Sequence, residues 1–518
     1  MRAPSAMKAY VAATMVGGVM AAIGPVADLP IVNLDIAPDG FLRPTVLAGG
    51  TFPGPMIRGN KGDNFKINVI DELGQKGMDV TTSIHWHGID QKQSVSMDGT
   101  AMMSQCPIVP GGSFEYNFNV SDQAGTFWYH SHLGAQYCDG LRGAMVVYDP
   151  NDPHAGLYDV DDESTVITLA DWYHYMSSEA PRIPAFNTTL INGLGRDPGT
   201  TANTSLAVIN VVHGQRYRFR VIAMSCDPNF LFSIDRHQLT VIEADGSNVQ
   251  PIVIDEMQIL AGQRYSVVLN ADQPVDNYWV RALPNAKNAS YEGGRNAAVL
   301  RYAGADLFAD PETQKSGGQL PLLETNLHPL EKVVLPGKPY PGGADVNIAL
   351  DSTFDYKTLK FLVNNVSFTS PDVPVLLQAL SGAKRAQDLL PSGSIYGIKR
   401  NQSVEITMPG GVVGGPHPMH LHGQSFYVVR SAGNSTYNWV DPVYRDTVDI
   451  GDGNDLVTIR FMADNPGPWF IHCHIDWHLA AGFAAVLAIE DPDIANEVPT
   501  PESWEQLCPS YTKYAQKM

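Results

Sequence analysis

Two stretches of this 518-residue chain, GTFWYHSHLGAQYCDGLRGAMVVYDP (125–150) and GPWFIHCHIDWHLAAGFAAVLAIEDP (467–492), align along their whole length without a gap. In this alignment His130 matches His472 and His132 matches His474. Ser131 stands where the second stretch has Cys473. Each stretch opens with an aromatic run that is typical of a β-strand. The chain therefore carries a repeated β module.

A third copy of the module lies between these two. The segments KGDNFKINVI (61–70), HGQRYRFRVI (213–222) and RNQSVEITMP (400–409) each read as a turn followed by an alternating strand. In the middle copy, Arg281 and Leu283 occupy the histidine positions. We therefore expect an all-β protein of three tandem Greek-key sandwich or barrel domains. Their predicted bounds are 22–152, 153–320 and 321–518, after a leader at 1–21.

Four His-x-His pairs use eight of the 15 histidines: His85/His87, His130/His132, His420/His422 and His472/His474. Side chains alternate along a strand, so each pair directs two imidazoles to one face. A single pair would read as surface histidines, but four pairs favour metal sites in the first and third domains. Imidazole ligands suit copper or zinc.

Cys473 lies between two of these histidines and must point to the opposite face. It needs partners of its own, and His478 and His417 are the candidates. A thiolate with two imidazoles is the trigonal ligand set of a blue copper centre. Zinc is the alternative, but it has no redox chemistry that would use such a site. Four further cysteines can form two disulfides, although other pairings stay open.

The N-terminus and the charge predict an exported protein. Arg2 and Lys8 precede an apolar run that ends in small residues, which is typical of a signal peptide cleaved after Ala21. A membrane anchor is the alternative, but the run is too short. Seven glycosylation sequons support export: Asn119, Asn187, Asn203, Asn288, Asn365, Asn401 and Asn434. The formal charge of −20 argues against nucleic acid and anionic membranes as partners.

Four motifs in this order resemble the multicopper oxidases, and within them the fungal laccases: HWHGIDQ (85–91), GTFWYHSHLGAQYCDG (125–140), HPMHLHGQSF (417–426) and GPWFIHCHIDWHLAAGF (467–483). The resemblance covers nearly the whole chain after the leader. It implies three cupredoxin domains, which agrees with the repeats, and four copper ions.

The resemblance also implies the ligands of each copper ion. A type 1 copper would be held by His417, Cys473 and His478, and a type 2 copper by His85 and His420. Two type 3 coppers would share the remaining six histidines: His87, His130, His132, His422, His472 and His474. The implied disulfides are Cys106–Cys508 and Cys138–Cys226, which leave Cys473 free.

Three further residues gain a role from the resemblance. Phe483 stands at the axial position of the type 1 copper, where many relatives have methionine. Because phenylalanine cannot coordinate copper, it should raise the reduction potential of the type 1 site. The alternative is that Phe483 is a core residue, and it can be both. Asp227 would face the substrate beside His478 and accept a phenol proton. Without the resemblance, Asp227 would be interpreted as a turn residue before a proline. Asp98 would supply protons near the cluster. Gln424 and Ala480 depart from the residues common in relatives, and the second leaves the fine tuning of the potential open.

These features predict a secreted, monomeric laccase. Phenols and aromatic amines would each give one electron to the type 1 copper, and Cys473 would conduct four electrons to the cluster that reduces dioxygen to water. The role we expect is lignin degradation or detoxification of phenolics. The alternatives are a ferroxidase and a copper-binding or electron-carrying protein without oxidase activity.

Overall fold

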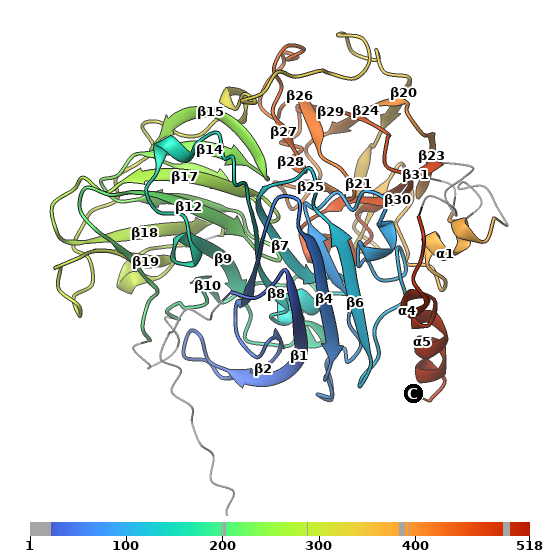
Figure 1. Cartoon of the computed structure of the whole chain (residues 1–518), viewed down its shortest axis with the longest axis horizontal. Helices are drawn as coiled ribbons and strands as arrows, with labels where there is room; N and C mark the ends of the chain where they lie inside the picture. The colour runs from blue at the N-terminus through green and yellow to red at the C-terminus, as the bar shows by residue number, and fades with distance from the viewer. Residues whose placement is uncertain are drawn as a thin grey trace, which may run out of the picture.

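Strands form three successive pairs of sheets in the computed structural model (Figure 1). The structure describes residues 22–197, 199, 204–286, 289–382, 389–391, 393–490 and 498–517. The predicted signal peptide and the sequons Asn203 and Asn288 lie outside the described residues. In the described part of the chain no sheet closes on itself, so each pair is an open sandwich and not a closed barrel.

The first sandwich pairs two four-stranded sheets. One has the order β2 (Arg43–Ala48), β1 (Val26–Ile36), β4 (Asn64–Asp71), β6 (Ser113–Asn119), and the other β3 (Gly54–Asn60), β8 (Arg142–Tyr148), β7 (Gly125–Ser131), β5 (Ile84–His87). In β6 buried and exposed residues alternate strictly, as expected for a strand with one face in water. In β7 every residue is buried, because its second face lies against the rest of the protein.

The second sandwich pairs a six-stranded with a five-stranded sheet. The first has the order β10 (Thr188–Ile191), β9 (Val166–Trp172), β12 (Arg216–Ala223), β17 (Arg264–Asn270), β14 (Leu239–Ala244), β15 (Ser247–Ile254). The other has the order β11 (Val208–Val211), β19 (Ala297–Tyr302), β18 (Asn277–Pro284), β13 (Phe230–Ile234), β16 (Met257–Ile259). Arg281, at a histidine position of the repeat, is buried in an ion pair with Asp235 at 2.7 Å. This copy therefore has a salt bridge where the others have imidazoles.

The third sandwich pairs two five-stranded sheets. Their orders are β20 (Val346–Ala349), β24 (Ser403–Pro409), β29 (Leu456–Met462), β26 (Phe426–Arg430), β27 (Tyr444–Arg445), and β23 (Ile395–Lys399), β31 (Ala484–Glu490), β30 (Gly467–Cys473), β25 (Pro418–Leu421), β28 (Thr447–Asp449). A hairpin of β21 (Ser352–Asp355) and β22 (Lys360–Val363) accompanies them. The structure confirms the sequence alignment, because β7 and β8 begin and end at the residues that the alignment matches to the first and last residues of β30 and β31.

The described helices are short: α1 (Val375–Leu380), α2 (Asp476–Ala480), α4 (Glu502–Glu505) and α5 (Leu507–Ala515). Helix α5 lies beside the first sandwich, although it ends the chain (Figure 1). The disulfide Cys106–Cys508 ties it there, and Trp504 Nε1 donates to the carbonyl of Ser104 at 2.9 Å. The C-terminal segment of the chain is thus tied to the first sandwich. No helix in the described ranges is long and apolar enough to cross a membrane.

Candidate metal centres

The four His-x-His pairs meet between the first and third sandwiches. One pair lies on β5, and the other three lie at the ends of β7, β25 and β30. Strand pairing places His85 opposite His130, and His420 opposite His472. The residue inside the first pair, Trp86, is fully buried and packs on the first core against Tyr116. The alternation predicted from the sequence therefore sends the imidazoles to one face and the apolar side chain to the other.

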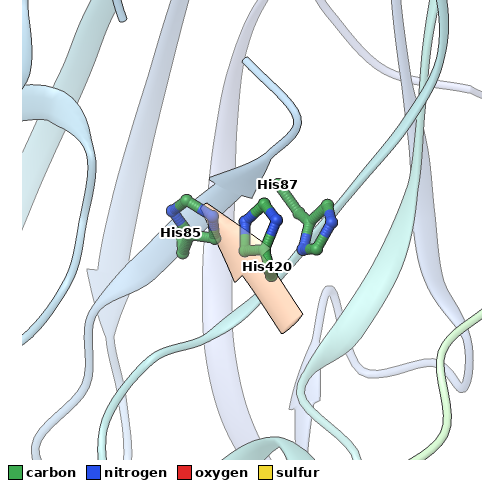
Figure 2. A group of neighbouring side chains, drawn as sticks. All are labelled: His85, His87 and His420. Carbon is green, nitrogen blue, oxygen red and sulfur yellow. The ribbon is translucent and has the colours of Figure 1, made fainter. Parts of the chain in front are cut away.

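The eight imidazoles form three groups in which one ligand atom from each residue lies within 4.8 Å of the others: His85, His87 and His420; His87, His130 and His474; His132, His422 and His472. Each group draws on both sandwiches. Figure 2 shows the first group, in which the ring centroid of His85 is 5.8 Å from those of both His87 and His420. The rings of His87 and His420 stack at 3.8 Å. Strand alternation could predict the common face but not which rings share a group.

The ring nitrogens are arranged to receive cations. The Nδ1 atoms of His85, His130 and His420 donate to the carbonyls of Asp98, Ser131 and Asp446 at 2.8, 2.9 and 3.0 Å. Their Nε2 atoms are buried and have no hydrogen-bond partner in the part of the chain that the structure describes. Fixing one nitrogen with a backbone carbonyl orients the other as a metal ligand.

Other ring nitrogens face each other directly. His422 Nε2 lies 3.1 Å from His472 Nε2, and His474 Nε2 lies 3.1 Å from His87 Nδ1. Two lone pairs at this separation repel unless a proton or a cation lies between them. The donor set and its unpaired nitrogens therefore fit bound metal ions.

Burial keeps these imidazoles neutral. It lowers the pKa of seven of them, and neighbouring rings lower most of these further: His87, His130, His132, His420, His422, His472 and His474. The pKa of His472 falls to about 3. Neutral imidazole is the form that binds a metal ion, so the cluster can bind metals across the physiological pH range.

Cys473 lies on the other face of β30 with the two partners that the sequence predicted. Its Sγ is 3.6 Å from Nδ1 of both His417 and His478, and these two nitrogens are 3.2 Å apart. Burial lowers the pKa of His417 to about 4 and that of His478 to about 3. Burial also raises the pKa of the Cys473 thiol, so this group becomes a thiolate only when a cation stabilises it.

The first sandwich has a counterpart of this site that contains neither a thiol nor an imidazole. Ser131 and Gln136 occupy the positions of Cys473 and His478, and Thr82 that of His417. The hydroxyls of Ser131 and Thr82 both donate to Gln136 Oε1, at 2.7 and 2.8 Å. A hydrogen-bonded triad thus replaces the thiolate and imidazoles of the third sandwich.

Comparison with known proteins agrees with this geometry. Three models of the multicopper oxidase family match residues 31–152, 163–305 and 368–493. A laccase from Phlebia radiata is 57% identical over 505 residues, covering 97% of each chain. A laccase from Trametes hirsuta is 56% identical over 508 residues, again covering 97% of each chain. The chain belongs to the multicopper oxidases, and within them to the fungal laccases.

Solved multicopper oxidases have the same fold. The laccase from Botrytis aclada superposes with a TM-score of 0.81 at 29% identity, covering 95% of this chain and 93% of the other. Fet3p, described as a multicopper oxidase that functions in iron import, gives 0.82 at 26% identity, covering 94% and 95%. The predicted family and the three cupredoxin-like domains are confirmed, and copper is the cofactor that this family implies.

Phe483 lies beside the group formed by His417, Cys473 and His478. It is fully buried, and its ring centroid is 5.2 Å from that of His417. Phe361, which the sequence did not indicate, stacks on Phe483 at 4.9 Å and contacts the His478 ring at 4.5 Å. These two phenylalanines exclude water from one side of the group.

Two buried carboxylates contact the histidine cluster. Asp98 was predicted near it, and its carboxylate lies 3.1 Å from His422 Nδ1 and accepts from Thr100 Oγ1 at 2.6 Å. Burial opposes its ionisation, but the neighbouring His85 and the hydrogen bond from Thr100 hold its pKa below the usual value. Asp446 was missed because no motif surrounds it. Its Oδ1 accepts from His87 Nε2 at 3.2 Å.

Asp227 is a partly exposed residue in an otherwise buried loop of the second domain. This loop packs against helix α2, which carries the partly exposed His478. The backbone N–H of Asp476 in this helix donates to the carbonyl of Cys226 at 2.8 Å. Burial, with the nearby Asp171, raises the pKa of Asp227 to about 7. The structure thus brings this loop to helix α2, and the substrate role of Asp227 that the resemblance implies stays a prediction.

Both implied disulfides are present, Cys106–Cys508 and Cys138–Cys226, and Cys473 is free and buried. The second disulfide joins the first domain to the loop that carries Asp227. The position of this loop beside helix α2 is therefore fixed by a covalent bond to the first domain.

Proposed function

We propose that this laccase binds four copper ions. The type 1 ion is held by His417, Cys473 and His478, the type 2 ion by His85 and His420, and the type 3 pair by His87, His130, His132, His422, His472 and His474. The observation that carries the proposal is the position of Cys473, whose thiol lies within 3.6 Å of two imidazole nitrogens on one face of β30 while its neighbours His472 and His474 enter the cluster on the other.

Copper bound in these sites supplies one-electron oxidation of the substrate and the four-electron reduction of dioxygen to water. Cys473 connects the two centres, because it is covalently continuous with His472 and His474. A second connection is the hydrogen bond from His472 Nδ1 to the carbonyl of Cys473 at 2.9 Å. The chain thus provides both a covalent and a hydrogen-bonded link between the centres.

Small phenols and aromatic amines are the proposed substrates, bound next to His478. A pKa of about 7 suits Asp227 for accepting a phenol proton near neutral pH, because a general base works best when its pKa is near the working pH. Asp98 is the proposed carrier of protons for dioxygen reduction, since its carboxylate is hydrogen-bonded to the cluster histidine His422.

The remaining parts of the proposal rest on the sequence. We propose a secreted, glycosylated monomer with domains at 22–152, 153–320 and 321–518, acting in lignin degradation or detoxification of phenolics. Export is supported by the leader and the sequons.

The alternatives differ in what they oxidise. Fet3p, with a similar fold, is described as functioning in iron import, which keeps a ferroxidase as the second candidate. A non-enzymatic electron carrier needs one copper centre only, whereas the chain has eight further clustered histidines.

Oxygen uptake separates these functions. The copper-loaded protein should consume oxygen rapidly with a substituted phenol and far more slowly with ferrous iron at equal concentration. Faster uptake with iron would favour the ferroxidase, and no uptake with either would favour the carrier. A Cys473→Ser variant in the same assay controls for uptake by adventitious copper.

A further inference from the structure

Among its described residues the second domain contributes no candidate ligand, yet its turn at residues 260–264 reaches the histidine cluster. Gly262 has a φ of +89°, and a Cβ built on it would lie 3.0 Å from His87 Cε1 and 3.1 Å from His474 Cδ2. The next residue, Gln263, donates from Nε2 to the carbonyl of Thr447 at 3.1 Å. Only glycine permits this approach, so the turn forms a wall of the cluster.

Arg264, at the end of this turn, makes a bidentate ion pair with Asp446 of the third domain. Nη1 donates to Oδ1 at 2.8 Å and Nη2 to Oδ2 at 2.7 Å. The two side chains are 0% and 2% exposed. Nε also donates to the carbonyl of Thr126 in the first domain at 2.9 Å, and Nη1 to that of Gly262 at 3.0 Å. The guanidinium is thereby fixed by partners from all three domains.

Asp446, which Arg264 holds in place, accepts hydrogen bonds from two cluster histidines. Its Oδ1 accepts from Nε2 of His87, of the first domain, at 3.2 Å, and its carbonyl accepts from Nδ1 of His420, of the third domain, at 3.0 Å. Gly88 directly follows His87, and a Cβ there would overlap the Arg264–Asp446 pair. The chain thus leaves space for this pair beside the two histidines.

We propose that Arg264 is a positioning residue of the cluster: by fixing Asp446 it holds His87 and His420, from opposite domains, in one orientation. The inference rests on the proposed copper cluster. It gives the second domain, which carries Arg264, a part in metal binding. Removing a partner that orients a metal-bound histidine typically weakens metal affinity by roughly 10–100-fold.

The test compares Arg264→Lys with Arg460→Lys. Arg460 is a matched control, because it is also fully buried and pairs with a carboxylate, Glu405 at 2.6 Å, but has no contact with the cluster among the described residues. Copper per chain is measured after dialysis against a graded series of chelator concentrations, together with the blue absorption and the electron paramagnetic resonance spectrum.

In Arg264→Lys, cluster copper should be lost at chelator concentrations about 10–100-fold lower than in the parent, while the blue absorption is retained. Arg460→Lys should behave as the parent. Equal copper retention in Arg264→Lys and the parent, or equal losses in both variants, would overturn the proposal. If Arg264→Lys does not fold, Asp446→Asn serves instead. Asparagine has the same size but is uncharged and has only one acceptor oxygen, so it cannot keep the bidentate ion pair with Arg264. Parent-like copper retention in this variant would overturn the proposal. A parent without cluster copper would instead contradict the proposed function.

Discussion

Replacing Asp227 by asparagine should change the pH dependence of stability in a defined direction. The pKa of this carboxyl is raised from 3.8 to about 7 by burial and by Asp171. Asp171 is itself fully buried, and its Oδ2 accepts from the backbone N–H of Asp227 at 3.2 Å. The ionised form of Asp227 is therefore disfavoured in the folded protein.

The sign follows from proton binding. Between about pH 4 and pH 7 the folded state holds a proton that the unfolded state has released, so stability falls as the pH rises through this window. A shift from 3.8 to about 7 corresponds to roughly 4 kcal/mol at 1.36 kcal/mol per pKa unit. Because the side chain is half-buried and screened by solvent, we expect on the order of 1–2 kcal/mol. Asp227→Asn should be more stable than the parent by this amount at pH 8 and equal to it at pH 4.

Denaturant unfolding of parent and variant at pH 4, 6 and 8 measures this difference. Asp452→Asn, which removes an exposed carboxyl, controls for the change in net charge. The same variant tests the role of Asp227 in catalysis: phenol oxidation should lose its rise towards pH 7, while oxidation of a non-phenolic donor changes little. Parallel stability curves for parent and variant from pH 4 to pH 8 would refute the reasoning, and equal losses for both donors would remove Asp227 from the substrate site.

Two further substitutions test the third domain and its attachment. Phe483→Met should lower the type 1 potential, because a thioether stabilises Cu(II) more than Cu(I), with about 59 mV for each tenfold change in equilibrium constant; an unchanged potential in redox titration of the blue band would mean that Phe483 only packs. Cys508→Ser should destabilise the protein by up to about 6 kcal/mol, since the disulfide spans a sequence separation of 402 residues. Denaturant midpoints measure that loss, and identical midpoints would contradict it.

The sequence predicted what depends on strand periodicity. His85 and His87 share a face because they are two residues apart, and Trp86 between them packs on the core for the same reason. The opposite orientation of Cys473 follows from the same alternation. The repeat likewise predicted that β7 and β30 correspond.

Contacts between distant segments could not be predicted in this way. Asp446 and Arg264 belong to no spacing motif, and they meet only because β17 and the β27–β28 segment lie together in the folded chain. Phe361 reaches His478 from a hairpin more than a hundred residues earlier in the chain. A single sequence contains periodicity and local motifs, but not the packing of one domain on another.

The assignment of Cys473 is tested by the blue absorption and the copper content of Cys473→Ser beside the parent. Serine has nearly the same size but offers no thiolate, so the variant should lose the blue band and phenol oxidation. The eight cluster histidines are untouched, and we expect the variant to retain the type 2 and type 3 copper and to lose only the type 1 ion. A variant as blue as the parent would show that Cys473 is not the type 1 ligand, and a variant without any copper would contradict two centres with separate ligand sets.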